Sequence, residues 1–187
     1  MPYIYTKTNK TMLDTAPILP KAIKYAVTAH EQTLHRYDGA PYSVHLAMAA
    51  HYADMFSYLL PEEKRDYVLS AVWLHDTIED CRITYNDLKK VFGAEIAEMV
   101  FAVTNNRGRT RDERADEDYY RGIRNTTYAT FIKLCDRLAN VEYSAVFGEE
   151  RMMDVYRSEA PHFFSAIKSD LPEADYTPMV KALKKFL

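Results

Sequence analysis

The chain has 187 residues, which is long enough for one well-buried core and short for two, so we expect a single domain over residues 1–187. Hydrophobic residues make up 48% of it and only 5 glycines and 8 prolines interrupt it, a composition that predicts an all-α fold of one compact multi-helix domain. The net charge of −3 gives no general attraction to a polyanion, which argues against binding to duplex nucleic acid or to an acidic membrane.

Apolar residues that recur at helical spacing predict most of the secondary structure. In chain order, the helices predicted in this way cover residues 19–34, 44–60, 94–103, 128–143, 151–168 and 177–187. Between the first two, the dipeptide Asp38-Gly39 and the proline that follows indicate a turn over residues 36–42.

Helix boundaries are indicated at two further places. Pro61 followed by two glutamates is typical of a first helical turn and predicts a helix that carries His75 near its end. Thr84 with Asp87 three residues later resembles a capping box, which opens a short helix that Gly93 closes.

The segment from Thr104 to Thr127 is strongly polar, with arginines set among acidic residues. Guanidinium groups are natural bidentate clamps for phosphate, and Arg107 and Arg109 are therefore candidate substrate contacts. A solvated, salt-bridged loop is the alternative interpretation, because exposed ion pairs of this kind are common and contribute little to stability.

Nothing in the sequence indicates export or membrane insertion. The first twenty residues lack a basic segment followed by an apolar core, and no apolar run approaches the roughly 18 residues of a membrane span. Cys81 and Cys135 form no disulfide framework and are interpreted as small buried hydrophobes rather than metal ligands. We therefore expect a cytoplasmic protein, and the sequence does not define its oligomeric state.

Residues of the types that bind metal ions lie on or beside three apolar segments. His45 lies at the start of one predicted helix, His75-Asp76 at the end of another, and Asp136 between two leucines of a third. Because successive helical residues point about 100° apart, His75 and Asp76 can reach one ion together only near a helix end. Imidazole and carboxylate ligands together suit Mn²⁺, Fe²⁺ or Zn²⁺, and a cation would remove the cost of burying Asp136.

Charged residues next to these candidate ligands suggest further roles. Glu79 and Asp80 follow His75-Asp76 by one turn, and a pair of carboxylates beside a metal suits the activation of water. Lys133 and Arg137 flank Asp136 and are candidates for contact either with a metal ligand or with phosphate. The alternative interpretations are hydrogen-bonded core histidines, a solvated helix end for Glu79 and Asp80, and a surface role for Lys133 and Arg137.

Three strings identify a family resemblance. Arg36–His45 (RYDGAPYSVH), His75–Asp80 (HDTIED) and Lys133–Asn140 (KLCDRLAN), in this order, closely resemble the HD-type hydrolase domain of the RelA/SpoT group, including its small stand-alone alarmone hydrolases. The resemblance covers roughly residues 19–165. The chain departs from the family pattern at Leu46, where the family usually has proline, and at Ala139, where it often has histidine or tyrosine.

The resemblance implies both an activity and a set of roles. It implies an all-α, Mn²⁺-dependent enzyme of the hydrolase-only form that removes pyrophosphate from the 3′ position of guanosine tetra- and pentaphosphate, the alarmones of the stringent response. By position it makes metal ligands of His45, His75, Asp76 and Asp136. It likewise makes Glu79 and Asp80 the pair that orients or deprotonates water, and Arg36 and Asn140 contacts to the nucleotide.

Two other functions remain open at this point. The same site would also suit a phosphatase of a nucleoside monophosphate, a cyclic nucleotide or a nicotinamide dinucleotide phosphate. A non-catalytic nucleotide sensor on the same fold is the second alternative, although a sensor usually needs neither a complete ligand set nor the Glu79-Asp80 pair. In each case the expected partner is a small phosphorylated nucleotide.

Overall fold

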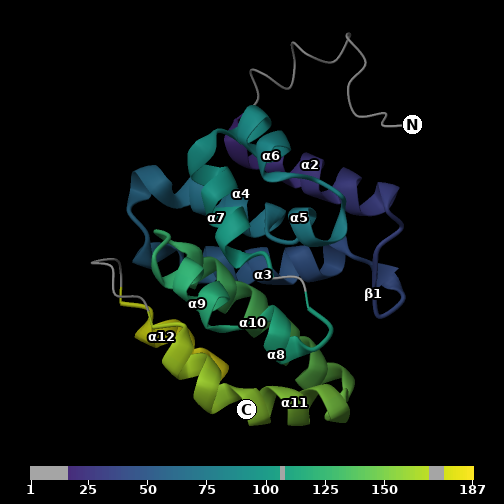
Figure 1. The fold of residues 1–187 in the computed structure, drawn as a ribbon, viewed down its shortest axis with the longest axis vertical. Coiled ribbons are helices and arrows are strands. Elements are labelled where there is room, and N and C mark those ends of the chain that lie inside the picture. Colours follow the sequence, from purple (N-terminus) through teal and green to yellow (C-terminus); the bar gives the residue numbers. More distant parts are fainter. Residues whose placement is uncertain (1–16, 106–107, 169–174) are drawn as a thin grey trace.

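Helices form nearly all of the regular structure in the part of the chain described by the computed structural model, namely residues 17–105, 108–168 and 175–187. This confirms the predicted all-α fold (Figure 1). The longer helices are α2 (Ile18–Gln32), α3 (Ser43–Met55), α4 (Arg65–Leu74), α6 (Tyr85–Phe92), α7 (Ala94–Val103), α9 (Glu117–Arg124), α10 (Ala129–Phe147), α11 (Glu150–Ala166) and α12 (Thr177–Leu183). The shorter elements are α5 (Thr77–Asp80), α8 (Arg111–Arg114), two short strands, and the 3-10 helices Ser57–Leu59 and Glu62–Lys64.

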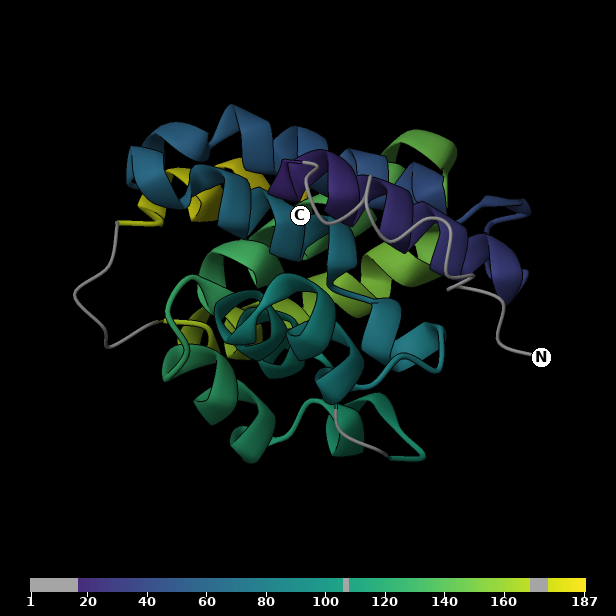
Figure 2. The same ribbon diagram turned by 90° about the horizontal axis from the view of Figure 1, so that it is seen from above.

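The core is built around α10, which packs against α3, α4, α7, α9, α11 and α12. Its apolar side chains, among them Phe131, Leu134 and Leu138, are completely buried, and each such side chain contributes roughly 1.5–3 kcal/mol. In Figure 2 the blue α3 and the teal-green segment around α8 and α9 lie on opposite sides of the molecule. The residues of α10 therefore face elements from both halves of the sequence.

The expected turn over residues 36–42 is a small hairpin. Strand β1 (Arg36–Tyr37) pairs antiparallel with β2 (Ala40–Pro41), and only Asp38 and Gly39 lie between them. Both of these residues have positive φ, 48° and 77°, as the favoured two-residue hairpin turn requires. The hairpin fixes the direction in which the side chains of β1 point.

The predicted helix over 44–60 is shorter in the structure, because α3 ends at Met55. Pro61 forces the preceding residue, Leu60, into an extended conformation with ψ of 145°, which no helix can continue through. Pro61 itself precedes the 3-10 helix Glu62–Lys64, and α4 begins only at Arg65. The turn predicted at Pro61 is therefore a separate 3-10 helix, and the α-helix that ends near His75 begins after it.

The helix that carries the first metal-binding dipeptide is interrupted at that dipeptide. Helix α4 ends at Leu74, and α5 begins at Thr77. The hydroxyl group of Thr77 donates a hydrogen bond to the carbonyl of Leu74 at 2.7 Å and so satisfies one open carbonyl at the end of α4. His75 and Asp76 therefore lie between two helices, as the sequence argument required for a shared ion.

Two predicted boundaries are confirmed. Thr84 and Asp87 form the capping box at the start of α6, and Gly93, with φ of 87°, separates α6 from α7. Among the described residues, no helix combines the length and apolar character needed to cross a membrane.

Candidate metal centre

Three of the four predicted ligands form a buried cluster. His45 comes from the first turn of α3, His75 from the break after α4, and Asp136 from the middle of α10. Their ligand atoms all lie within 4.8 Å of one another, and all three residues are buried. Asp76 joins them, because its Oδ2 lies 2.9 Å from Nε2 of His75 and 3.6 Å from Nε2 of His45.

The distances between ligand atoms fit a first-row cation. The Nε2 atoms of the two histidines are 3.2 Å apart. Oδ1 of Asp136 lies 3.3 Å from Nε2 of His45 and 3.8 Å from Nε2 of His75. Metal–ligand bonds of about 2.0–2.2 Å place neighbouring ligand atoms roughly 3 to 3.5 Å apart. The donor set of two imidazoles and two carboxylates therefore fits a divalent ion without large movement.

Hydrogen bonds orient the ligands from behind. Nδ1 of His75 donates to the carbonyl of Val72 at 2.7 Å, which leaves the lone pair of its Nε2 directed at the cluster. The hydroxyl group of Tyr42 donates to Oδ2 of Asp76. Among the described residues, none offers a hydrogen-bond partner to the buried Nδ1 of His45, and its ring packs against the rings of Tyr37 and Tyr42 at centroid distances of 5.0 and 5.4 Å.

The electrostatics of the cluster also favour a positive charge at its centre. Although burial opposes ionisation, Asp76 and Asp136 raise the pKa of His75 well above its usual value. Burial likewise opposes the charge on Asp136, yet Lys133 and the two histidines hold the pKa of that carboxyl well below its usual range. The carboxylates thus stay ionised and attract a cation.

Asp136 is held by two neighbours on α10. Nζ of Lys133 lies 2.8 Å from Oδ2 of Asp136, and the side-chain amide of Asn140 donates to Oδ1 at 2.6 Å. The hydroxyl group of Tyr37 in turn donates to the amide oxygen of Asn140 at 3.0 Å. Lys133 and Asn140, both predicted as substrate contacts, therefore lie in the site and touch a predicted metal ligand directly.

A polar cavity of about 400 Å³ opens over the cluster. This volume falls within the range of cavities that hold small ligands. Asp76 and Asp136 lie in its wall. Of the predicted site residues that the structure describes, only three do not line the cavity: His45 and His75, which are buried, and Arg109, which is exposed. The remaining predicted residues in the wall are Arg36, Glu79, Asp80, Lys133, Arg137 and Asn140.

The two acidic residues after His75-Asp76 differ in their surroundings. Glu79 is exposed and accepts hydrogen bonds from the backbone and side chain of Asn105, each at 3.3 Å. Burial, with further repulsion from Asp76 and Glu79, raises the pKa of Asp80 to about 7. The pair thus combines an accessible carboxylate with one that ionises near neutrality.

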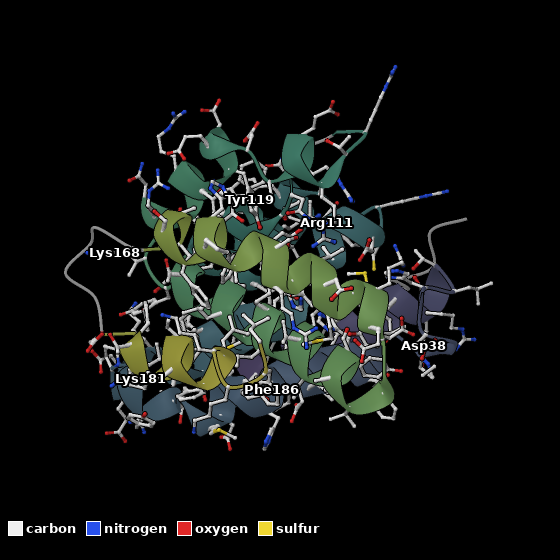
Figure 3. All side chains as sticks on the ribbon, turned by 90° about the horizontal axis from the view of Figure 1, so that it is seen from below. Asp38, Arg111, Tyr119, Lys168, Lys181 and Phe186 are labelled. Carbon is white, nitrogen blue, oxygen red and sulfur yellow. The ribbon has the colours of Figure 1, made fainter. Side chains whose placement is uncertain are left out.

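The structure places two arginines of the polar segment after Thr104 at the cavity. Arg107 lies outside the described residues, while Arg111 and Arg114 line the cavity. Figure 3 shows Arg111 beside α11, where it contacts both carboxylate oxygens of Glu159 at 2.6 and 3.2 Å. The segment is partly helical rather than only a loop, and the capping box of α8, Thr110 with Glu113, was a sequence signal for this.

Glu159 links two cationic residues of the cavity wall. Besides Arg111, it binds Nη1 of Arg137 at 2.7 Å, and the guanidinium of Arg137 also packs over the rings of Tyr156 and Phe163. No motif in the sequence pointed to Glu159, because it lies on α11, 22 residues beyond Arg137. The two cysteines are buried and free, in agreement with their interpretation as small hydrophobes.

The fold and the cluster together define an all-α protein with a histidine and carboxylate metal centre at the base of a polar cavity. A family model described as an HD domain matches residues 22–166, which is more than half of the chain. The chain therefore belongs to the HD domain family, and the predicted family resemblance is confirmed.

Curated relatives carry one recurrent activity in their names. Guanosine-3′,5′-bis(diphosphate) 3′-pyrophosphohydrolase MESH1 of Danio rerio is 29% identical over 125 residues, which cover 66% of this chain and 67% of that protein. The bifunctional (p)ppGpp synthase/hydrolase SpoT of Escherichia coli (strain K12) is 35% identical over 131 residues, covering 66% of this chain but 17% of that protein. The chain thus spans less than a fifth of the length of this bacterial relative.

A solved structure has the same fold. It is described as a metazoan ortholog of SpoT that hydrolyzes ppGpp and plays a role in starvation responses. It superposes with a TM-score of 0.69 at 22% identity, covering 91% of this chain and 94% of that chain. At this identity the likeness concerns the fold, and it agrees with the HD-type domain expected from the sequence.

Proposed function

We propose that this protein is a metal-dependent hydrolase that removes pyrophosphate from the 3′ position of guanosine tetraphosphate or pentaphosphate. The observation that carries the proposal is the cluster of His45, His75, Asp76 and Asp136 at the base of a cavity with cationic residues in its wall. The similarity to 3′-pyrophosphohydrolases supports the choice of substrate.

The proposed resident ion is Mn²⁺, held by the four clustered ligands, with Fe²⁺ or Zn²⁺ as alternatives of similar ligand preference. Such an ion would acidify a water molecule and withdraw charge from a phosphoryl oxygen. The protein is proposed to act in the cytoplasm as a single domain over residues 1–187, with a small nucleotide rather than duplex nucleic acid as its partner.

The residues of the chain would orient the substrate and move the proton. Arg36 and Asn140 would hold the base and ribose, while Lys133, Arg137 and Arg111 would face the phosphates, since charge-assisted bonds to phosphate are strong. Water attacks the phosphorus bonded to the 3′ oxygen, and the bond between these two atoms breaks. Glu79 or Asp80 accepts the proton of the water, the 3′ oxygen takes up a proton, and pyrophosphate leaves intact.

The decisive experiment is product analysis with a panel of nucleotides and Mn²⁺-loaded protein. Guanosine tetraphosphate should yield GDP and pyrophosphate, and the pentaphosphate should yield GTP and pyrophosphate, as phosphorus NMR can read directly. GTP, nucleoside monophosphates, cyclic nucleotides and NADPH should remain intact. The variant His75→Ala should be inactive, and His51→Ala, which removes an exposed histidine of α3, should match the parent.

Other outcomes would assign another function. Release of inorganic phosphate from a 5′ position, or consumption of monophosphates with no action on 3′-pyrophosphorylated nucleotides, would favour a nucleotidase. Tight nucleotide binding without any turnover would favour a sensor.

A further inference from the structure

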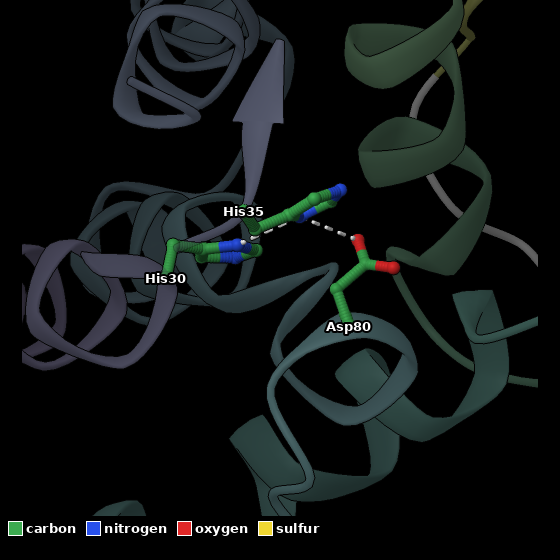
Figure 4. Close-up of side chains that lie close together, drawn as sticks. All are labelled: His30, His35 and Asp80. Atoms are coloured by element: carbon green, nitrogen blue, oxygen red, sulfur yellow. Dashed lines mark hydrogen bonds and ion pairs between the residues drawn. The ribbon is translucent and has the colours of Figure 1, made fainter. Parts of the chain in front are cut away.

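A second group of metal-binding side chains lies in the same region and has no part in the centre described above. It consists of His30 near the end of α2, His35 just before β1, and Asp80 at the end of α5. The three ligand atoms lie within 4.8 Å of one another, and Figure 4 shows His30 and Asp80 approaching the ring of His35 from its two sides. Nδ1 of His35 lies 3.3 Å from Nδ1 of His30 and 3.4 Å from Oδ2 of Asp80.

Hydrogen bonding alone does not account for this arrangement. His35 presents a single nitrogen to two neighbours, and one proton on it can be well directed at only one of them. His30 is 1% exposed, and its other nitrogen, Nε2, has no hydrogen-bond partner among the described residues. Burial disfavours a positive charge on the His30 ring, so the ring is neutral. One of its nitrogens then carries a lone pair that can bind a cation.

The backbone holds His35 in this place at some cost. Helix α2 closes with hydrogen bonds from Leu34 to the carbonyl of Glu31 and from His35 to that of His30, both 3.1 Å long. This closing motif needs a left-handed residue, usually glycine, at the position of Leu34, which has φ of 55°. A residue with a side chain is strained in this left-handed conformation, so the chain tolerates strain where His35 turns back over His30.

Tyr42 fixes both histidines and connects the two groups of ligands. The rings of His30 and His35 stack on the Tyr42 ring at 4.3 and 4.0 Å, with interplanar angles of 17° and 18°. The hydroxyl group of the same tyrosine binds Asp76 of the first centre. Because stacking fixes the planes of the two imidazoles, it also limits the directions in which their Nδ1 atoms can point.

We propose that His30, His35 and Asp80 form a second divalent-cation site, through Nδ1, Nδ1 and Oδ2. These two separations, 3.3 and 3.4 Å, match those of ligands around a tetrahedral first-row ion, for which bonds of about 2.0–2.2 Å imply roughly 3.3 to 3.6 Å. Two imidazoles and one carboxylate suit Zn²⁺, Mn²⁺ or Co²⁺, and an open fourth position would face the cavity, whose wall includes His35 and Asp80.

The second site deepens the proposed function and, in this respect, rests on it. A cation held there would bind a phosphoryl oxygen of the 3′ diphosphate from the part of the cavity wall that carries His35 and Asp80. A carboxylate that binds a cation is a poor proton acceptor, so Asp80 becomes a ligand and Glu79, which is exposed to the cavity, becomes the residue that accepts the proton of water.

The test is a count of bound ions in the absence of nucleotide, so it does not depend on the substrate. Protein stripped of metal is titrated with Mn²⁺ and, separately, Zn²⁺ by calorimetry, and the occupied protein is checked by elemental analysis. We expect two ions per chain in the parent, and one in both His35→Ala and Asp80→Asn. Glu79→Gln and the exposed-histidine control His51→Ala should keep two, and circular dichroism confirms that each variant is folded.

The variant His45→Ala separates the two sites, because it removes a ligand of the first site only and should still bind one ion. The double variant His45→Ala with His35→Ala should bind none. A parent that saturates at one ion, or a His35→Ala variant that still binds two, overturns the second site. The same holds if His35→Ala lowers the rate without changing the ion count, since His35 would then only orient Asp80. Failure of the proposed function is a separate result, namely two bound ions with no release of pyrophosphate.

Discussion

The side-chain amide of Asn140 donates a hydrogen bond to Oδ1 of Asp136, and this oxygen is the one that faces His45. Asn140 therefore orients Asp136, a proposed metal ligand that lies one turn away on α10, in addition to its proposed contact with the nucleotide. Partners of this kind behind a ligand typically contribute about 10- to 100-fold to metal affinity or activity.

Asn140→Ala should accordingly weaken Mn²⁺ binding by about 10- to 100-fold, measured by calorimetry, in addition to any rise in KM. The amide oxygen is already bound to Tyr37, so Tyr37→Phe provides a matched control that removes one hydrogen bond without touching Asp136. Unchanged metal affinity in Asn140→Ala, with only KM raised, would show that Asn140 serves the nucleotide alone.

Asp136→Ala should abolish turnover and bound metal, and it should also destabilise the fold. The variant leaves the largely buried ammonium of Lys133 without its carboxylate partner, and breaking a fully buried pair typically costs about 3–5 kcal/mol, which is the upper bound here. Urea denaturation of metal-free protein measures this. The double variant Lys133→Met with Asp136→Ala should recover much of the lost stability but none of the metal, whereas an unchanged midpoint in the single variant would contradict the buried pair.

Glu79→Gln should keep the fold and the metal while slowing turnover by about 10²- to 10⁴-fold, because the shape is retained and the basic group is lost. Single-turnover rates with guanosine tetraphosphate are the measurement. Glu98→Gln, which changes a glutamate of α7 outside the cavity, is the control. A Glu79→Gln variant as fast as the parent would make Glu79 a solvated helix end.

Arg111 and Arg109 give a direct test of which arginines face the substrate. Arg111 lines the cavity, whereas Arg109 is exposed and lies outside its wall. Arg111→Ala should raise KM for guanosine tetraphosphate by roughly tenfold, in keeping with the loss of a charged hydrogen bond, and Arg109→Ala should leave KM nearly unchanged. Equal effects of the two variants would favour a solvated role for both.

Glu159 makes stability depend on pH in a direction that can be calculated. Burial opposes its charge, but Arg111 and Arg137 lower the pKa of its carboxyl below the usual value. The stabilising contribution is therefore present above the unfolded-state pKa and is lost as pH falls through the lower folded-state pKa. Glu159→Gln should flatten the stability profile on the acidic side, below about pH 5, and leave it parallel to the parent at higher pH.

Denaturation midpoints of the parent and Glu159→Gln, collected from pH 3 to 8, test this prediction. The outcome that contradicts it is a constant difference between the two proteins across the whole range. Such a result would mean that the contacts of Glu159 with the two arginines do not depend on its charge.

The sequence could single out the residues of the proposed metal centre, which the structure brings together, because they belong to short local patterns. His75-Asp76 could serve one ion only at a helix end, and α4 does end at Leu74. Asp136 stood out as a charge among leucines, and the structure buries it beside Lys133. The all-α class followed from apolar periodicity, which depends on neighbouring residues alone.

The features that escaped prediction are those created by tertiary contact. Glu159 and Arg137 are 22 residues apart, and only the packing of α11 on α10 brings them together. His30 and His35 were not singled out, because a histidine near a helix end has no distinguishing neighbour in the sequence. Helices α8 and α9 were not predicted, because most of their residues are charged. The buried residues of α9, Tyr119, Tyr120 and Ile123, nevertheless recur at helical spacing.

The hairpin that carries Arg36 and Tyr37 is inserted between α2 and α3, while the four ligands of the first centre lie on α3, α10 and the break after α4. The exposed guanidinium of Arg36 can therefore be exchanged without moving any of those four ligands. If Arg36 contacts the base as proposed, a lineage with this architecture could vary the base that it recognises through a few residues of this hairpin and keep the same ligands at the proposed metal centre.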